Sequence, residues 1–267
     1  MRDFQFHRPS TVADALRILR QASQGKLLGG GQSFLPVLKL DMAEPSDLIS
    51  VSGIPELRGI RSDGQQVTIG AATSHAEVAR SAEVRAKIAG LARLADGIGD
   101  PQVRNRGTIG GSLAHADPAA DYPAAILGLS ATVKTDRRSI AADSFFTGLF
   151  ETALEPDEII TSVSFTVPQR SAYAKFASHA SRYAVVGVMV AQYAGGVRVG
   201  ITGAGPSAFR WKQAEDALSI RFSADAITAG MTYPSDDLTS TPEASAEYRA
   251  HLIPVMTRRA VQAALAG

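Results

Sequence analysis

The first fifty residues switch between helical and strand periodicity. Between residues 10 and 24, apolar side chains recur at the three- and four-residue spacing of an amphipathic helix. Short apolar runs at 26–28 and 48–51 predict strands, and a partly helical stretch at 36–42 lies between them. Helix and strand alternating in this way predict a small N-terminal α/β unit, residues 1–54.

A middle α+β unit is expected over residues 55–168. Its expected elements are a hairpin over 60–70, helices over 74–81, 84–95 and 122–129, and strands over 131–134, 138–140 and 159–165. Between two of these helices, residues 97–121 are dense in Gly, Pro, Asp and Asn. A long irregular stretch inside a compact domain is usually functional, so this segment is a candidate for ligand binding.

The rest of the chain predicts a third unit, residues 169–267, behind a linker at 168–171. Strand patterns at 172–177, 184–193 and 197–202 are followed by helical patterns at 213–218, 224–229 and 244–265. Strands joined by short turns favour an antiparallel sheet. The chain as a whole therefore predicts an α+β fold that ends in an antiparallel sheet with helices. A ligand is expected between the first two units, with the third closing one side.

Composition narrows the possible functions. The chain has 267 residues, of which 45% are hydrophobic, an ordinary fraction for a globular protein with real cores. Its net charge is +1, from 27 basic and 26 acidic residues, which gives no electrostatic case for nucleic acid or an anionic membrane. No apolar run reaches the roughly 18–20 residues of a membrane span, and the N-terminus lacks an apolar signal core. A cytoplasmic location is therefore expected.

The residues that usually hold metals are absent or scattered. The chain has no cysteine, so it can form no disulfide and can hold no iron–sulfur cluster through thiolates. Its five histidines show no ligand spacing, so no metal site is expected. If this protein moves electrons, an organic cofactor must carry them here.

Two glycine-rich loops are the strongest candidates for a binding site. One is Gly29-Gly30-Gly31-Gln32-Ser33, and the other is Thr108-Ile109-Gly110-Gly111-Ser112. Glycine allows positive φ and close approach to a ligand, and successive backbone N–H groups can converge on a phosphate as a nest. Two facing nests suit a pyrophosphate, so the loops predict a dinucleotide held by main-chain amides. Neither loop has the spacing of a nicotinamide Rossmann motif or a P-loop, and no strand–nucleophile–helix elbow of a hydrolase is present.

Longer stretches around both loops resemble one known family. Residues 26–36 (KLLGGGQSFLP) and 102–121 (QVRNRGTIGGSLAHADPAAD) are similar to the two flavin loops of the FAD-binding medium subunits of molybdenum hydroxylases. These are the subunits of the aerobic carbon monoxide dehydrogenase and xanthine dehydrogenase type. The similarity continues through 157–160, 183–188 and 248–252, and so spans nearly the whole chain. It implies an FAD-binding fold of the PCMH/VAO (p-cresol methylhydroxylase and vanillyl-alcohol oxidase) type, with FAD bound non-covalently.

The resemblance also implies which residues bind the cofactor. Its two flavin loops place these at Lys26, Leu27, Leu28, Gly29, Gly30, Gly31, Gln32, Ser33, Thr108, Ile109, Gly110, Gly111 and Ser112. Four further positions match family residues near the sugar, adenine or flavin: Asp121, Ile160, Lys175 and Tyr183. No catalytic residue is expected, because electron transfer needs no general base.

The implied function is that of a flavin electron-transfer subunit in a larger complex. A large molybdenum-cofactor subunit would oxidise the substrate, and a small [2Fe-2S] subunit would relay the electrons to FAD. This chain would then pass them to an external acceptor such as a quinone, NAD or oxygen. The absence of cysteine agrees with clusters carried on another polypeptide. A dimer of heterotrimers is the implied assembly.

Two other functions stay open. Related flavin folds support free-standing oxidases of small alcohols or phenols, although these usually carry a larger substrate-cap domain than residues 169–267 provide. The chain could also be a non-catalytic assembly module that has lost its flavin, but the intact glycines of both loops argue against this. Co-purifying molybdenum and iron–sulfur subunits, a yellow lone chain active on an alcohol, or a colourless chain would distinguish the three functions.

Overall fold

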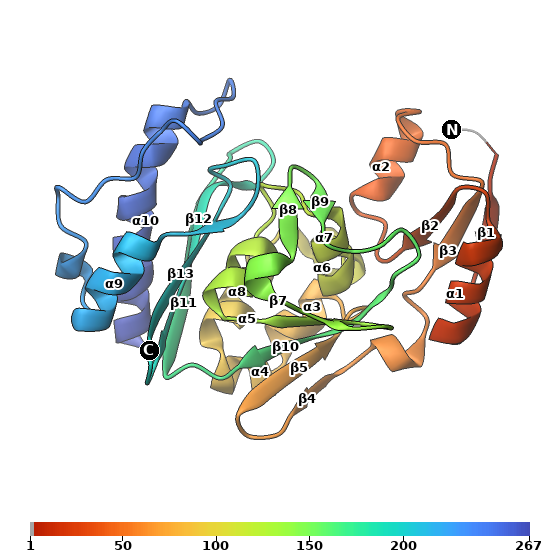
Figure 1. The fold of residues 1–267 in the computed structure, drawn as a ribbon, viewed down its shortest axis with the longest axis horizontal. Helices are drawn as coiled ribbons and strands as arrows, with labels where there is room; N and C mark the ends of the chain where they lie inside the picture. The colour runs from red at the N-terminus through yellow and green to blue at the C-terminus, as the bar shows by residue number, and fades with distance from the viewer. Residues whose placement is uncertain (1–2) are drawn as a thin grey trace.

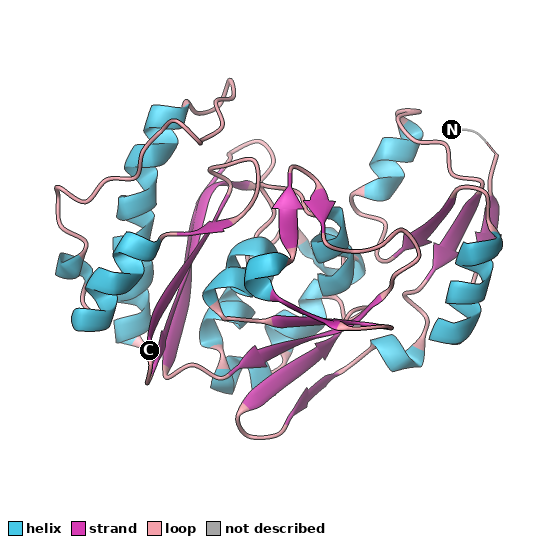
Figure 2. Cartoon of the chain, in the orientation of Figure 1, coloured by secondary structure: helices cyan, strands magenta, loops and turns pink. Residues whose placement is uncertain are grey.

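Three main β-sheets with covering helices follow one another along the chain (Figures 1 and 2). The structure is a computed structural model that describes residues 3–267. Helices and strands are mixed throughout, so the expected α+β character is confirmed. Each of the three expected units contains one main sheet, while the unit boundaries themselves stay predictions.

The first sheet is small and parallel. Its strand order is β1 (Gln5–His7), β3 (Asp47–Ser50), β2 (Gly25–Leu28). Two helices accompany it: α1 (Val12–Gln21) and α2 (Phe34–Lys39). The first glycine-rich loop connects β2 to α2, at the carboxyl end of a parallel strand. Ligands of α/β sheets commonly bind at this end.

The second sheet is antiparallel and carries most of the helices. Its order is β4 (Ile60–Ser62), β5 (Gln66–Gly70), β10 (Ile160–Thr166), β6 (Thr132–Thr135), β7 (Ser139–Ala141). The helices of this unit are α3 (His75–Arg80), α4 (Ala82–Lys87), α5 (Ala89–Asp96), α6 (Pro101–Arg106), α7 (Ile109–His115) and α8 (Tyr122–Gly128). Smaller elements are the 3-10 turns η1 (Pro55–Leu57) and η2 (Ala142–Ser144) and the hairpin of β8 (Phe146–Gly148) and β9 (Glu151–Thr152). Apolar side chains of the sheet and helices form one buried cluster between them.

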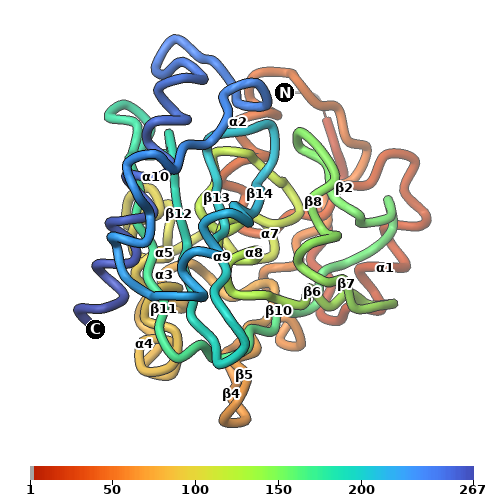
Figure 3. Tube along the Cα trace, turned by 60° about the vertical axis from the view of Figure 1, so that its left-hand side comes forward, coloured from red at the N-terminus to blue at the C-terminus, as the bar shows by residue number. Residues whose placement is uncertain are grey.

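The third sheet is antiparallel and lies between two layers of helices (Figures 1 and 3). Its order is β11 (Arg170–Ala177), β12 (Ala184–Tyr193), β13 (Gly196–Thr202), β14 (Phe209–Arg210). It is followed by α9 (Lys212–Ile220), η3 (Ala224–Ala226) and α10 (Ala246–Ala266). Along β12, Met189 and Ala191 join the core of the second unit, whereas Val188 and Val190 join the core beneath α9 and α10. This period-two alternation joins the third unit to the second through a dry interface.

Four local predictions were wrong. The helix expected over 84–95 is broken at Ile88 (φ −139°, ψ 65°) into α4 and α5. The break brings α5 so near β11 that a Cβ on Gly90 would lie 2.9 Å from the Ala172 Cα. This contact is distant in sequence and leaves no local pattern. The remaining three errors concern the segment 97–121, the linker at 168–171 and the helix over 224–229.

The segment expected to be irregular contains α6 and α7. Each begins at a capping side chain: Asp100 accepts a hydrogen bond from the Val103 N–H at 2.8 Å, and Thr108 accepts one from the Gly111 N–H at 3.2 Å. Such caps offset the poor helix propensity of glycine and proline. The supposed linker instead starts β11 at Arg170, and only the 3-10 turn η3 forms within 224–229. None of the helices described over residues 3–267 is long and apolar enough to cross a bilayer.

Candidate flavin-nucleotide site

A cavity of about 940 Å³ opens between the first and second units and reaches the third. Its walls come from residues 25–34, 98–121, 150–160 and 180–183, with a few single positions elsewhere. The cavity therefore lies where the ligand is expected, between the first two units with one side closed by the third, and binding of the ligand there stays a prediction. The volume lies near the upper end of the range for small-molecule sites, so the cavity suits a large ligand.

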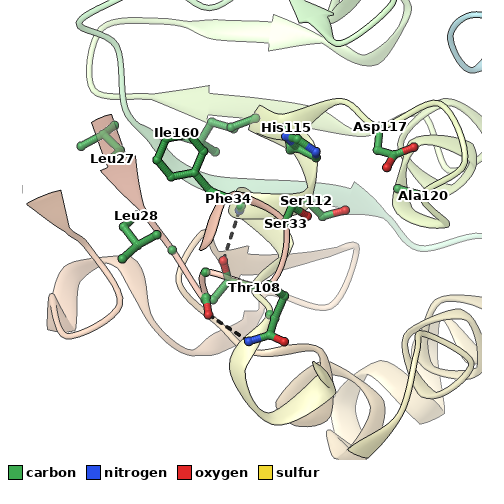
Figure 4. A pocket seen from close by; sticks show the side chains of 18 of the residues that line it. Leu27, Leu28, Ser33, Phe34, Thr108, Ser112, His115, Asp117, Ala120 and Ile160 are labelled. Atoms are coloured by element: carbon green, nitrogen blue, oxygen red, sulfur yellow. Dashed lines mark hydrogen bonds between the residues drawn. The ribbon is translucent and has the colours of Figure 1, made fainter. Parts of the chain in front are cut away.

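The two glycine-rich loops lie at the middle of this cavity. Figure 4 shows Leu27, Leu28 and Ile160 toward one end and Asp117 and Ala120 toward the other. Ser33 and Ser112 lie between them and line the cavity, and the Ser33 side chain hydrogen-bonds with Tyr183. The loops thus separate an apolar end from a polar end.

The first loop presents unused backbone donors. Within residues 3–267, the amide nitrogens of residues 29–33 donate no hydrogen bond to the chain. Gly31 has a φ of +76°, a conformation that glycine adopts without a steric penalty. Five adjacent amides without acceptors form the kind of concave donor surface that binds phosphate oxygens.

The second loop uses its amides inside the protein. The Ile109 N–H donates to the Thr73 carbonyl at 3.1 Å, and the Gly110 N–H donates to the Ala71 carbonyl at 2.9 Å. The Gly111 N–H donates to the Thr108 hydroxyl, which caps α7. The expected second nest is therefore wrong, because residues 71–73 lie alongside this loop and already accept its hydrogen bonds.

Two glycines of the first loop are explained by close contact with the second loop and the residue just before it. A Cβ on Gly30 would lie 1.9 Å from the Arg106 carbonyl oxygen, and one on Gly29 would lie 2.8 Å from the Thr108 hydroxyl. No side chain fits between backbones this close. Gly111 is different, because a Cβ there would have only the Thr108 hydroxyl within 4 Å, and Gly111 lines the cavity.

The charged side chains around the cavity do not favour the binding of an anionic ligand. Five carboxylates line it: Asp100, Asp117, Asp121, Glu155 and Glu158. Among the described lining residues, only Lys26 and Arg182 are permanently cationic. An anionic ligand must therefore rely on backbone donors, and the first loop is where these are free.

Asp121 lies at the polar end in a buried hydrogen-bond network. Its carboxylate accepts hydrogen bonds from the Tyr173 hydroxyl at 2.5 Å and from the Lys175 ammonium at 3.0 Å. Burial raises the pKa of Asp121, and the Lys175 charge opposes this rise. Lys175 also donates to the carbonyls of Gly97 and Arg182 at 2.9 and 3.1 Å, so it joins three chain segments.

The structure brings together nearly all the predicted cofactor residues. All of them line the cavity except Ile109, whose side chain is fully buried in the core of the second unit, and Lys175, which lies behind Asp121. Tyr183 lines the polar end and is 43% exposed. Burial raises the pKa of the Tyr183 hydroxyl, and the nearby carboxylates of Asp117 and Asp121 raise it further.

Several lining residues were not predicted. Residues 154–156, 158 and 159 line the apolar end, and Arg138 donates to the buried Glu158 carboxylate at 2.9 Å. His75 lies beneath the second loop, where burial lowers its pKa to about 4 and the Arg104 charge adds to the effect. Its Nδ1 has no hydrogen-bond partner among the described residues. Only tertiary packing brings these residues to the cavity, so no sequence spacing marks them.

Comparison with known proteins agrees with this geometry. Residues 2–169 match the family described as the FAD binding domain in molybdopterin dehydrogenase. The carbon monoxide dehydrogenase medium chain of Hydrogenophaga pseudoflava is 36% identical, covering 98% of this chain and 97% of that protein. The nicotine 6-hydroxylase medium subunit of Paenarthrobacter nicotinovorans is 33% identical, covering 95% and 94%.

Solved structures show the same fold over the full length. A chain of reconstituted CO dehydrogenase from Oligotropha carboxidovorans superposes with a TM-score of 0.90 at 31% identity, covering 99% of this chain and 98% of that chain. A chain of the carbon monoxide dehydrogenase from Hydrogenophaga pseudoflava gives a TM-score of 0.87 at 36% identity, covering 99% and 98%. The protein therefore belongs to the family of FAD-binding domains of molybdopterin dehydrogenases.

Proposed function

We propose that this chain is the FAD-binding electron-transfer subunit of a multi-subunit molybdenum hydroxylase. The observation that carries the proposal is the row of free amides at residues 29–33, which faces a large cavity poor in cations. Free backbone donors in a cavity of this size suit the diphosphate of a dinucleotide. Full-length similarity to medium chains of carbon monoxide dehydrogenases supports the same function.

Different lining residues contact different parts of FAD in this proposal. The amides of residues 29–33 hold the diphosphate, and the hydroxyls of Ser33 and Ser112 donate to the same part of the ligand. Leu27 and Ile160 offer apolar surface for the adenine, while Asp121 and Tyr183 lie at the opposite end. Bound FAD supplies the ability to take up and release electrons, and the protein positions it and sets its electronic environment.

The source and the fate of the electrons lie outside this chain. Because the chain has no cysteine, clusters that deliver electrons belong to a small [2Fe-2S] subunit, and substrate oxidation belongs to a large molybdenum-cofactor subunit. A quinone, NAD or oxygen receives the electrons. The dimer of heterotrimers, the PCMH/VAO fold class and the cytoplasmic location are further parts of the proposal.

The test is the flavin content of the purified chain and of one variant. We expect a yellow protein that releases FAD into the supernatant on acid precipitation. Gly111→Val places a branched side chain in the cavity next to the first loop. Displacing the diphosphate from one free amide of that loop loses a hydrogen bond to a charged group, which costs about 1.5–3 kcal/mol. FAD should therefore bind about 10- to 100-fold more weakly.

Gly53→Val is the matched control, because nothing lies within 4 Å of a Cβ at Gly53. Its flavin content should equal that of the wild type. A colourless wild-type chain that takes up no FAD on reconstitution would refute the proposal.

A further inference from the structure

Arg182 is held in a conformation that arginine rarely adopts. In the turn between β11 and β12 its φ is +63°, in the left-handed region, which costs a residue with a Cβ roughly 1–2 kcal/mol. Strain of this kind persists where the surroundings enforce it, and it clusters at functional sites. The position of Arg182 therefore calls for a functional explanation.

Three hydrogen bonds hold Arg182 in place. Its N–H donates to the Ser178 carbonyl at 3.0 Å, and its own carbonyl accepts from the Lys175 ammonium at 3.1 Å. Its guanidinium donates through Nη1 to the Gly99 carbonyl at 3.2 Å. The side chain is thus tied to the cavity wall, where residues 98–100 and 180–183 meet.

The charge of Arg182 is not compensated. In the part of the chain that the structure describes, no carboxylate lies within ion-pair distance of this guanidinium, whereas Lys175 behind it is paired with Asp121. Among the described residues, its guanidinium binds only the Gly99 carbonyl, which neutralises no charge. The wall of the polar end therefore contains one fixed positive charge, together with the carboxylates of Asp100 and Asp117.

The polar end is also where we expect the redox-active ring of a bound flavin. The opposite end is lined by residues 154–156, 158 and 159 and by apolar side chains such as Leu27 and Ile160, which suits adenine. Electrons must come from another polypeptide, so the ring that receives them has to lie near the surface. Tyr183 lines the polar end with 43% of its surface exposed, and Arg182 adjoins it.

We propose that Arg182 raises the reduction potential of the bound flavin by placing a fixed positive charge beside the isoalloxazine ring. This inference rests on the proposed function. Two electrons from the partner's [2Fe-2S] clusters and one proton from solvent convert the neutral oxidised ring to a reduced ring with one negative charge. A fixed cation stabilises the anionic product more than the neutral ring, and charge near the flavin is a known means of tuning it.

The experiment measures the midpoint potential of FAD bound to the full chain, by anaerobic titration against a redox dye. Arg182→Asn removes the charge with a residue that tolerates the left-handed region, Arg182→Lys keeps the charge, and Arg182→Glu reverses it. We expect Arg182→Asn to lower the equilibrium constant for two-electron reduction at least tenfold, which lowers the midpoint potential by about 30 mV. Arg182→Glu should lower the midpoint potential further, and Arg182→Lys should keep it near the wild-type value.

Two further readouts separate this electrostatic role from a structural one. Arg221→Asn removes another exposed arginine, beyond the end of α9 and outside the cavity wall, and should leave the potential unchanged. The difference between wild type and Arg182→Asn should shrink as salt rises, because exposed charges are screened. A turn that merely loses its shape would show no such salt dependence.

A failure of this inference can be distinguished from a failure of the proposed function. If wild type, Arg182→Asn and Arg182→Glu all bind FAD with equal potentials, the inference is overturned and the flavin function stands. If Arg182→Lys lowers the potential as much as Arg182→Asn, charge is not the cause and the inference is again overturned. If the wild-type chain binds no FAD, both the function and the inference fail.

Discussion

The amides of residues 29–33 and those of residues 109–111 differ in what they bind. The first group has no acceptor within residues 3–267, whereas the second donates to Thr73, Ala71 and Thr108. Both loops are rich in glycine and both line the cavity. Glycine therefore serves two purposes here: exposing donors to a ligand in the first loop, and allowing backbones to touch between the two loops.

The largest expected effect follows from the contact between the loops. Gly30→Ala would place a Cβ 1.9 Å from the Arg106 carbonyl oxygen, so the loops must separate. Overpacking usually costs about 1–3 kcal/mol, and we expect the upper end because backbone cannot move aside as a side chain can. Urea unfolding measures the free energy of unfolding, and flavin absorbance measures the FAD that is retained.

Gly53→Ala is the control for this variant, since its Cβ meets nothing within 4 Å. It should leave both the free energy of unfolding and the FAD content unchanged. A Gly30→Ala variant with wild-type stability would show that the loops do not need this close contact.

The second effect concerns His75, which lies beneath the second loop. Its folded pKa is about 4 against an ordinary value of 6.5, because burial disfavours the charged ring. Below pH 6.5 the unfolded chain therefore takes up a proton that the folded chain does not. Stability is lost as pH falls from 6.5 to about 4, by at most about 1.4 kcal/mol per pH unit.

The free energy of unfolding at pH 7 and pH 5 measures this loss. We expect wild type to lose roughly 2 kcal/mol more over this range than His75→Gln, which cannot titrate. His251→Gln removes an exposed histidine and should behave like the wild type. Equal pH dependence in wild type and His75→Gln would show that His75 is accessible to protons in the folded chain.

The third effect tests whether the second loop is structural. Thr108→Val removes the hydroxyl that accepts the Gly111 N–H and caps α7. Loss of such a cap costs about 1 kcal/mol. If the amides of the first loop hold the diphosphate, the Kd for FAD should change less than about threefold, which corresponds to well under 1 kcal/mol.

Ser81→Ala is the matched control, because Ser81 caps α4 through the Val84 N–H at 3.2 Å and lies away from the cavity. It should lose a similar amount of stability. If Thr108→Val instead weakened FAD binding tenfold or more, the second loop would be a direct ligand-binding element and the contrast between the loops would disappear.

Local sequence patterns predicted the positions of both loops but not their different uses. The strand before Gly29 and the helix after Ser33 follow from apolar spacing and the glycine run, and so does the open conformation between them. The second loop depends on the carbonyls of Ala71 and Thr73, which lie far away in sequence and leave no mark near Gly110. The left-handed Arg182 is likewise imposed by Lys175 and Gly99, so it could only be found in the folded chain.

The smallest expected effect concerns an ion pair between the first two units. The Arg20 guanidinium of α1 donates to the Asp157 carboxylate at 3.1 Å, and Arg137 of the second unit binds the same carboxylate. Both Arg20 and Asp157 are partly exposed, so the bridge is worth roughly 0.2–1 kcal/mol to stability. On this side the two units also share a buried apolar cluster that includes Leu19, Leu57 and Ile159. The ion pair adds a contribution that salt can screen.

Asp157→Asn should therefore increase the rate at which FAD dissociates by about two- to fivefold at low salt, an amount consistent with a bridge of this strength. The difference from wild type should vanish at high salt. Asp14→Asn is the control, because Asp14 pairs with Arg17 on the same helix without crossing to the second unit. If FAD dissociates at the same rate from wild type and Asp157→Asn at low salt, this ion pair does not help to hold the cavity closed.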